Sequence, residues 1–329
     1  MTDRRLLIVL AALGLATIVA SLGLGETGMG LRRLLLALVG QGPAGDRIVV
    51  WDIRLPRALA AFLSGAALGA SGAALQGLLR NPLAEPGVLG VSAVSTLAAT
   101  LTLYYGLASS FAPILPLAAV SGAMVATAIL LFCARKVRSI VTLILIGVGI
   151  TSFAGAVMAL LLNFAPNPYT LSDMINWTLG SVSNRGLNDI ALAGPFIALG
   201  IAILVATRRD LTALTLGEEV ARTIGLDLGR ARLRIVLGAG LATGGSIALA
   251  GTIGFVGIIA PHLVRCHVGH DPGRTVQPSA LLAGLLVVAA DVGVRLIPTS
   301  GELKLGVVAA LIGAPLFIWI AARRGVNDE

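Results

Sequence analysis

Charged residues are scarce in this sequence, and lysine is almost absent. Charged side chains make up 12% of the 329 residues, whereas about 25% is usual for soluble globular proteins. The only two lysines, Lys136 and Lys304, lack the preceding glycines of a P-loop, whose lysine reaches the phosphates of a nucleotide. We therefore expect that the chain hydrolyses no nucleotide and is no enzyme by itself.

Cysteine and histidine are also rare, which limits disulfide bonds and metal sites. Cys133 and Cys266 lie near span ends on the predicted cytoplasmic side, where thiols stay reduced, so we expect no disulfide. Cys266 is close to His267, His270 and Asp271, but a structural zinc site needs a complete set of ligands. With no second ligand cluster in the sequence, we expect neither a bound metal nor another cofactor on this chain.

What the sequence has in abundance is long hydrophobic runs. About 20 apolar residues form a helix that crosses a hydrocarbon core of about 30 Å. Prolines at 113 and 116 and a glycine at 251 divide the two longest runs, which gives ten predicted spans. They cover about residues 6–24, 58–79, 86–134 (two spans), 139–162, 190–207, 235–264 (two spans), 276–294 and 305–322. The predicted fold class is an all-α polytopic membrane protein with a single transmembrane domain, residues 1–329.

The distribution of positive charge predicts the orientation of the spans. Ten spans place both termini on one side of the membrane, where the loops hold sixteen lysines and arginines, and the opposite side holds eight. Because cytoplasmic loops carry the excess of positive charge, we expect both termini in the cytoplasm. The scattered basic residues also argue against a nucleic-acid partner, which would need one basic patch. Membrane lipid is the expected surrounding.

One long segment, residues 208–234, is too rich in charge to lie within a bilayer. Thr215 and Glu218 match a capping box and Gly225 a C-cap, which predicts a short amphipathic helix between them. Its apolar face carries Leu216, Val220 and Ile224. Its polar face carries both charge signs, on Glu218, Glu219 and Arg222. Docking into a groove on another protein is therefore favoured over lying on lipid.

Two other functions remain open on this evidence. An ion-driven carrier usually places an ionisable residue at mid-membrane. The nearest candidate is Asp291, which lies near a span end and can pair with Arg295 four residues later. Residues 69–72 match the GxSG motif of an intramembrane serine protease, with Ser71 as the nucleophile. That nucleophile needs a histidine partner, and the three histidines follow residue 261, near the cytoplasmic end of a span.

Six motifs, spread over nearly the whole chain, carry a family resemblance. They are RLPR (54–57), GAALGASGAALQGLLRNPLAEPGVLGVS (65–92), WTLGS (177–181), LGEEVARTIGL (216–226), GTIGFVGIIAPHLVR (251–265) and GVVAALIGAPLFIW (306–319). In these motifs the chain resembles the FecCD family, the permeases of type II ABC importers for cobalamin, haem and ferric siderophores.

The resemblance implies the ten-helix permease fold of type II ABC importers, in the inner membrane of a bacterium. It also implies a homodimer with the substrate pathway on its axis, two cytoplasmic ABC ATPase subunits that bind ATP and Mg, and a periplasmic substrate-binding protein. Overall likeness to the haem branch favours haem as the substrate. A ferric siderophore or cobalamin is the alternative.

The resemblance further implies roles for particular residues. Arg54, Arg57 and Arg295 resemble the external arginines that meet acidic residues of the binding protein; without the family, the first two are typical of arginines that snorkel to the membrane surface. Asn81 and Leu83 resemble residues of the cytoplasmic gate. The coupling helix, which the family seats in an ATPase groove, would comprise Leu216, Gly217, Glu218, Glu219, Val220, Ala221, Arg222, Ile224 and Gly225. Lys304 departs from the family, which usually has proline at this position.

Overall fold

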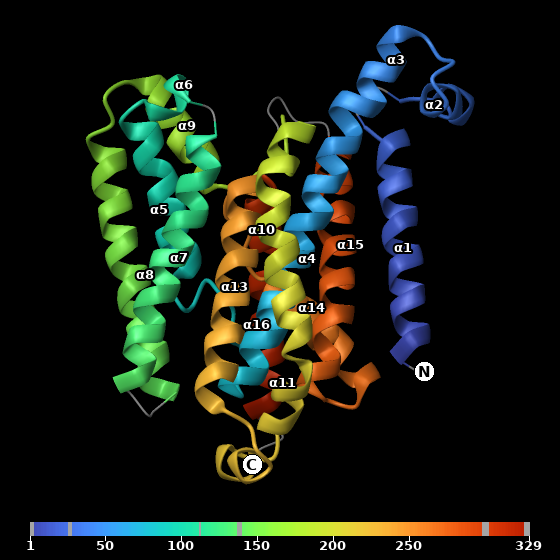
Figure 1. Ribbon diagram of the computed structural model, residues 1–329. Coiled ribbons are helices and arrows are strands. Elements are labelled where there is room, and N and C mark those ends of the chain that lie inside the picture. Colours follow the sequence, from blue (N-terminus) through green and yellow to red (C-terminus); the bar gives the residue numbers. More distant parts are fainter. Residues whose placement is uncertain (1–2, 26–27, 112, 137–139, 298–302, 326–329) are drawn as a thin grey trace.

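The computed structural model describes residues 3–25, 28–111, 113–136, 140–297 and 303–325. Every regular element within these ranges is a helix, which confirms the predicted all-α class. The long helices run side by side in one bundle, with short helices at both of its ends (Figure 1).

A helix occupies each of the ten stretches that the sequence predicts as spans. These helices are α1 (Asp3–Gly23), α4 (Leu55–Leu79), α5 (Val91–Tyr104), α7 (Ile114–Lys136), α8 (Ile140–Asn163), α10 (Leu187–Ala206), α13 (Leu228–Ala250), α14 (Val256–Arg265), α15 (Pro272–Leu296) and α16 (Leu305–Gly325). Within the described residues, seven helical segments are long and apolar enough to cross a membrane, whereas those of α5, α14 and α16 are shorter. Ten complete crossings therefore stay a prediction.

The predicted breaks within the two longest runs are confirmed. Between α5 and α7 the chain turns through the single-turn helix α6 (Leu107–Ser110), and α7 begins directly after Pro113. At the second break, α13 ends at Ala250 because Gly251 adopts a left-handed φ of +68°. A Cβ atom at Gly251 would lie 2.4 Å from the Trp177 carbonyl oxygen, so only glycine fits this turn.

Residues 25–57 differ from the loop that their polar composition predicts. They form α2 (Leu31–Leu38), α3 (Ala44–Ile48) and a π-helix (Val49–Arg54) that runs directly into α4. The physical reason is a small apolar cluster, in which Leu34 and Val50 pack with Leu22 of α1. The polar segment after α8 also contains a short helix, α9 (Pro168–Thr178), whose N-terminus is capped by Asn167.

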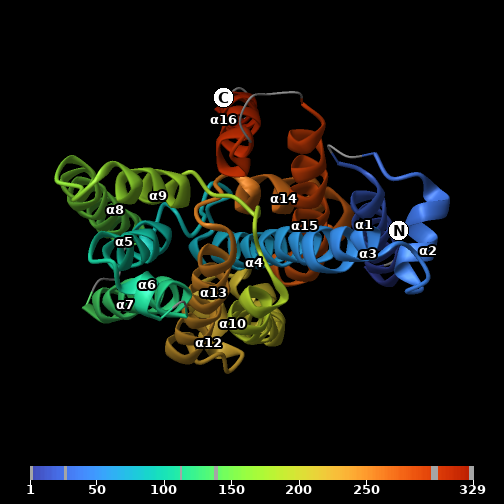
Figure 2. The ribbon, with the colours of Figure 1, turned by 90° about the horizontal axis from the view of Figure 1, so that it is seen from above.

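Helix α4 forms the centre of the bundle through its small residues. Figure 2 shows α4 between α13 on one side and α14 and α15 on the other. A Cβ atom at Gly72 would lie 1.9 Å from the Gly257 carbonyl oxygen of α14, and one at Gly69 would lie 2.3 Å from the Ser279 carbonyl oxygen of α15. Such backbone contact is how helices pack tightly where lipid removes the hydrophobic drive.

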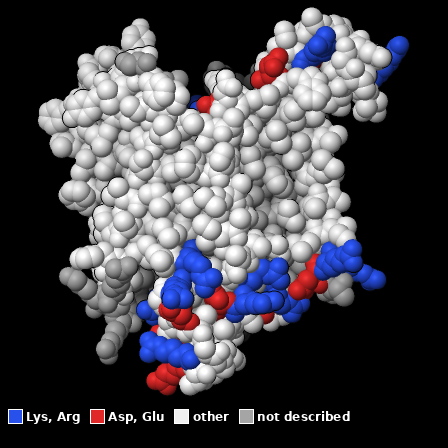
Figure 3. All heavy atoms as spheres, in the orientation of Figure 1, with Lys and Arg blue, Asp and Glu red and all other residues white. Residues whose placement is uncertain are grey.

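Charged side chains gather at the two ends of the bundle, and the wide band between them is free of charge on the face that Figure 3 shows. One end carries α2 and α3, and we call it the α2–α3 end. The other carries α11 (Arg208–Leu214) and α12 (Glu218–Thr223), and we call it the α11–α12 end. An uncharged band between two charged ends is typical of a protein that crosses a bilayer.

Candidate functional site

Residues 208–225, which we call the coupling segment, form two short helices, α11 and α12, where the sequence predicts one. The predicted capping box is wrong. Helix α12 begins at Glu218 after Gly217, which has a φ of +104° and provides no side-chain cap. Thr215 instead belongs to the end of α11, where its hydroxyl donates a hydrogen bond to the Thr212 carbonyl oxygen. The predicted end of the helix is confirmed, because Gly225 follows α12 with a φ of +91°.

An apolar row is exposed on this segment. Leu216, Val220 and Ile224 are 59%, 45% and 60% exposed, while Ala221 between them is fully buried. Large apolar side chains that stay exposed together mark a surface that another molecule covers.

Two ion pairs fasten the coupling segment to the start of α13. Glu218 pairs with Arg232 at 2.5 Å, and Asp210 of α11 pairs with Arg234 at 3.0 Å. A partner that displaces α12 would therefore also displace the start of α13 through these ion pairs. Helix α13 packs directly on α4.

The structure brings the three predicted docking arginines together at the α2–α3 end, where α1, α4 and α15 meet. Arg57 of α4 donates from Nε and Nη2 to the Asp291 carboxylate of α15, at 2.8–3.1 Å. Arg295 of α15 pairs with the same carboxylate at 3.1 Å. Arg54 donates to the Leu22 carbonyl oxygen of α1 at 2.7 Å.

These contacts bury most of the arginine surface. Arg54 is 5% exposed, and the side chains of Arg57 and Arg295 are 14% and 8% exposed. The pairing of Asp291 with Arg295 that the spacing predicts is confirmed, whereas its second partner, Arg57, lies 234 residues away in sequence. Docking of a binding protein on these arginines stays a prediction, and the structure offers only a small part of each side chain for it.

More accessible arginines lie in the neighbouring helices α2 and α3. Arg32 and Arg47 are exposed, and the side chain of Arg33 is 61% exposed although it pairs with Asp46. No role was predicted for these arginines from the sequence, because residues 25–57 give no sign of a folded platform. The available signal was the presence of these three arginines between the first two predicted spans, on the side of the membrane opposite residues 208–234.

The predicted gate residues form one tight turn directly after α4. The Leu83 amide donates to the Asn81 side-chain oxygen at 2.9 Å, and the Ala84 amide donates to the Asn81 carbonyl oxygen at 3.1 Å. Before the turn, Arg80 adopts a left-handed φ of +47°, and its guanidinium donates to the Leu214 carbonyl oxygen at the end of α11. One side chain therefore connects the coupling segment with the gate turn.

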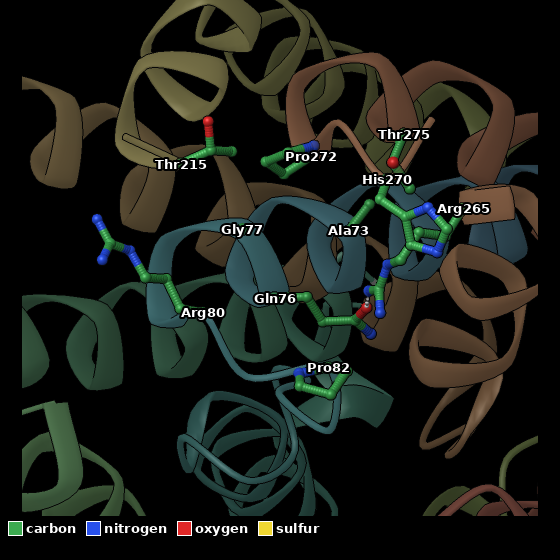
Figure 4. A pocket seen from close by; sticks show the side chains of 10 residues that line it. All are labelled: Ala73, Gln76, Gly77, Arg80, Pro82, Thr215, Arg265, His270, Pro272 and Thr275. Atoms are coloured by element: carbon green, nitrogen blue, oxygen red, sulfur yellow. Dashed lines mark hydrogen bonds between the residues drawn. The ribbon is translucent and has the colours of Figure 1, made fainter. Parts of the chain in front are cut away.

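A cavity of about 300 Å³ opens beside this turn, between α4, the start of α15 and the segment after α14. Figure 4 shows Gln76 and Arg265 pointing toward each other on one side, with His270 over Arg265, while Arg80 points away. Arg265 donates to the Gln76 side-chain oxygen, and the Gln76 amide nitrogen donates to the Gly257 carbonyl oxygen at 3.1 Å. These bonds join both ends of α14 to α4.

Glu85, four residues after the start of the gate turn, is a functional candidate that the sequence analysis missed. Its carboxylate accepts a hydrogen bond from the Phe255 amide at the start of α14, and burial raises its pKa to about 7. A carboxyl group that titrates near neutral pH is therefore built into the connection between α4 and α5. The proline-rich motif around Glu85 gave no sign of this burial.

The remaining candidate residues do not form a catalytic or metal site. Ser71 is fully buried, and its hydroxyl donates to the Ala239 carbonyl oxygen at 3.4 Å, so it cannot act as an exposed nucleophile. Cys266 lies 3.1 Å from His267, from sulfur to Nδ1. Among the described residues, no three histidine, cysteine or acidic side chains are close enough to share a metal.

Comparison with known proteins gives a consistent set of relatives. Residues 12–323 match the sequence model of the FecCD transport family. The chain is 40% identical over 280 residues to the vitamin B12 import system permease protein BtuC of Vibrio cholerae, which covers 84% of each protein. It is 39% identical over 284 residues to an uncharacterized ABC transporter permease protein, YvrB of Bacillus subtilis, which covers 84% of this chain and 79% of that one.

The fold has a solved counterpart. A structure described as an inward-facing conformation of a transporter assigned to the metal-chelate type of ABC transporters superposes with a TM-score of 0.87. The two sequences are 27% identical, and the match covers 97% of this chain and 99% of that one. The predicted permease fold is therefore confirmed. The chain belongs to the FecCD transport family and is a multi-span membrane permease of an ABC importer.

Proposed function

We propose that this chain is the permease subunit of an ATP-driven importer that carries vitamin B12 into the cytoplasm of a bacterium. The observation that carries this proposal is the 40% identity with a permease named for vitamin B12 import. The earlier preference for haem has no support among these relatives, so haem and a ferric siderophore become the alternatives.

ATP would be bound and hydrolysed, with Mg, by two separate ATPase subunits seated against the α11–α12 end. The exposed row of Leu216, Val220 and Ile224 supports this arrangement, because an interface needs a central apolar patch. Movement of α12 would reach the gate turn at Asn81 and Leu83 through the contact between Arg80 and the Leu214 carbonyl. The chain itself would need no cofactor.

Two copies of the chain would form a homodimer around the substrate pathway. The surface that suits this role is a groove of about 610 Å³ between the end of α9, the segment before α14, and α16, lined mainly by small and apolar residues. Leu311 and Ile312 of α16 are 70% and 62% exposed beside it. Such a surface fits both a second apolar subunit and a bulky, weakly charged substrate.

A periplasmic substrate-binding protein would dock at the α2–α3 end. The predicted docking residues Arg54, Arg57 and Arg295 lie there, together with the more exposed Arg32 and Arg47. This orientation places both termini and the α11–α12 end in the cytoplasm, where the positive-inside rule expects the larger share of lysine and arginine.

The test is transport by the purified complex of this chain with its ATPase, reconstituted in liposomes. We expect ATP hydrolysis and uptake to rise when the binding protein is loaded with vitamin B12, and to stay at the basal level with haem or a ferric siderophore. Selective stimulation by haem would replace the proposed substrate. Uptake that follows a proton gradient and persists with an ATPase variant unable to hydrolyse ATP would reinstate the secondary carrier.

A further inference from the structure

The motif WTLGS (177–181) carries an aromatic side chain, Trp177, that none of the sites described above uses. Trp177 lies in the last turn of α9, and the motif continues into the connection to α10. Because α10 ends beside α11, its start and this connection lie at the opposite, α2–α3 end of the bundle (Figure 1). In the same connection, the Arg185 guanidinium carbon Cζ lies over the Trp177 ring, 5.0 Å from its centre. We call these two residues the Trp177–Arg185 pair.

Both members of the pair have a buried donor without an acceptor. Trp177 is 8% exposed, and its indole Nε1 has no hydrogen-bond acceptor within the described residues. The Nε atom of Arg185 is also buried and without an acceptor there. Buried N–H groups in folded proteins are nearly always hydrogen-bonded. Two such donors in one stacked pair therefore indicate that an acceptor reaches them from another molecule.

The positive charge of Arg185 is not balanced by an ion pair. With the part of the chain that the structure describes, Arg185 makes neither a hydrogen bond nor an ion pair. Burial lowers the pKa of its guanidinium, and the Asp189 carboxylate raises that pKa by less. Asp189 itself accepts a hydrogen bond from the Gly186 amide at 2.8 Å, at the start of α10. Since arginine keeps its charge in proteins, Arg185 suits an anionic group of another molecule.

The pair adjoins the groove of about 610 Å³ that we propose for the substrate pathway. Thr178 and Leu179, which follow Trp177 directly, line that groove. The Gly180 carbonyl oxygen then accepts a hydrogen bond from the Gly306 amide of α16 at 3.2 Å. In Figure 2, the connection from α9 to α10 crosses the middle of the bundle. The backbone that carries Trp177 is therefore fixed to one wall of the proposed pathway.

The environment of the pair favours a group of the substrate over a side chain of the binding protein. Arg32 and Arg47 are exposed, as expected for charges that steer the encounter of two proteins. Arg185 is only partly exposed and lies against an aromatic ring. A few polar donors in a largely apolar pocket typically fix the orientation of a small ligand.

We propose that the Trp177–Arg185 pair binds an anionic oxygen group of the substrate as it enters the groove from the α2–α3 end. The Arg185 guanidinium and the Trp177 indole N–H donate hydrogen bonds to its oxygens. Vitamin B12, the proposed substrate, carries a phosphodiester of this kind. The role in import rests on the proposed function, whereas the binding of an anion by the pair does not.

The first test measures anion binding by the full chain in nanodiscs, through the fluorescence of Trp177. Trp51→Phe with Trp319→Phe leaves Trp177 as the only tryptophan. We expect a saturable change of its emission with dimethyl phosphate, beyond that with sodium chloride at equal ionic strength. Arg185→Gln should weaken this binding about tenfold, as for the loss of a hydrogen bond to a charged group. The matched control is Arg230→Gln, which removes a highly exposed arginine at the other end of the bundle.

A conservative variant keeps this test decisive if Arg185→Gln does not fold. Arg185→Lys retains the charge but not the planar group with several donors, so its affinity for dimethyl phosphate should be intermediate. Equal responses to dimethyl phosphate and sodium chloride would overturn the proposal. So would parental affinity in both Arg185 variants, or an equal loss of affinity in Arg230→Gln.

The second test measures uptake by the complex of this chain and its ATPase in liposomes, with binding protein loaded with vitamin B12 or with cobinamide. Cobinamide lacks the phosphodiester and the nucleotide attached to it. Arg185→Gln should slow uptake of vitamin B12 about tenfold and leave uptake of cobinamide near the parental rate. An equal loss for both ligands would reduce Arg185 to a structural role. Absence of uptake by the parent complex, together with anion binding in the first test, would instead count against the proposed import function.

Discussion

The guanidinium of Arg57 and the carboxylate of Asp291 join α4 to α15 through a two-nitrogen contact at 2.8–3.1 Å. Asp291 is 1% exposed and also pairs with Arg295. One buried carboxylate therefore balances two arginines at the place where α1, α4 and α15 converge. Loss of one partner of such a pair is costly, because it leaves the other charge buried without compensation.

We expect Asp291→Asn to destabilise the complex by about 3–5 kcal/mol, because it leaves two buried guanidinium groups without their carboxylate. Arg57→Gln should cost less, because Asp291 keeps Arg295 as a partner. The measurement is thermal unfolding of the purified complex. Asp46→Asn is the control, since its partner Arg33 is largely exposed. Equal stability of Asp291→Asn and the parent protein would show that the cluster contributes nothing.

Docking of the binding protein should depend more on the exposed arginines than on the buried ones. Arg32→Glu together with Arg47→Glu should slow association several-fold at low salt, because rim charges mainly steer encounter. The difference should disappear at high salt, where the screening length falls to a few ångströms. The test measures the rate at which the binding protein associates with the permease complex immobilised on a sensor surface.

The result for Arg54, Arg57 and Arg295 must be separated from their effect on folding. If these residues dock the binding protein directly, their glutamine variants should slow association even at temperatures where thermal unfolding shows that the variant complexes are fully folded. A normal association rate for the double variant Arg32→Glu and Arg47→Glu at low salt would contradict a docking role of helices α2 and α3.

Truncation of the coupling row should weaken assembly with the ATPase without weakening the permease. Leu216→Ala with Ile224→Ala removes exposed apolar side chains, so the unfolding temperature of the isolated permease should change little. Affinity for the ATPase should fall about tenfold or more, as for central interface residues. Leu31→Ala, at a 72% exposed leucine of α2, is the control. Normal ATPase recovery from the double variant would exclude this surface as the ATPase contact.

Glu85 should make stability depend on pH near neutrality. Burial raises its pKa from 4.5 to about 7, so the folded state binds a proton that the unfolded state releases at lower pH. Stability from this group is complete below about pH 4.5 and is lost as the pH rises through about 7.

The Glu85→Gln variant keeps the neutral form at every pH, so its stability relative to the parent should increase as the pH rises from about 4.5 to about 7 and stay constant above that range. Thermal unfolding of both complexes across that range is the measurement, and Asp173→Asn, at an exposed aspartate of α9, is the control. A constant difference between Glu85→Gln and the parent would place the titration elsewhere.

Much of the fold follows from the sequence because hydrophobic runs of sufficient length have few alternatives to helix in a membrane. The breaks at Pro113 and Gly251 were also predictable, because proline and glycine interrupt helices through their own backbone properties. The helices within residues 25–57 were not, since they depend on packing against Leu22 of α1. The start of α12 was also missed, because the conformation of Gly217 overrides the capping pattern of its neighbours.

The candidate sites likewise include local features that the sequence could predict and long-range contacts that it could not. The exposed coupling row could be predicted from helical periodicity, which is a local property. The contacts of Arg57 with Asp291 and of Arg80 with Leu214 join residues more than a hundred positions apart. The raised pKa of Glu85 likewise arises only when α14 packs against the segment after α4.

The glycine contacts of α4 restrict which parts of the protein can move during transport. Gly72 and Gly69 place the α4 backbone directly against carbonyl groups of α14 and α15, with no side chains between that could repack. We expect these three helices to move as one rigid block. A change of access would then be absorbed at the margins of that block, in the turn at Asn81 and in the glycine-bounded segment around α12.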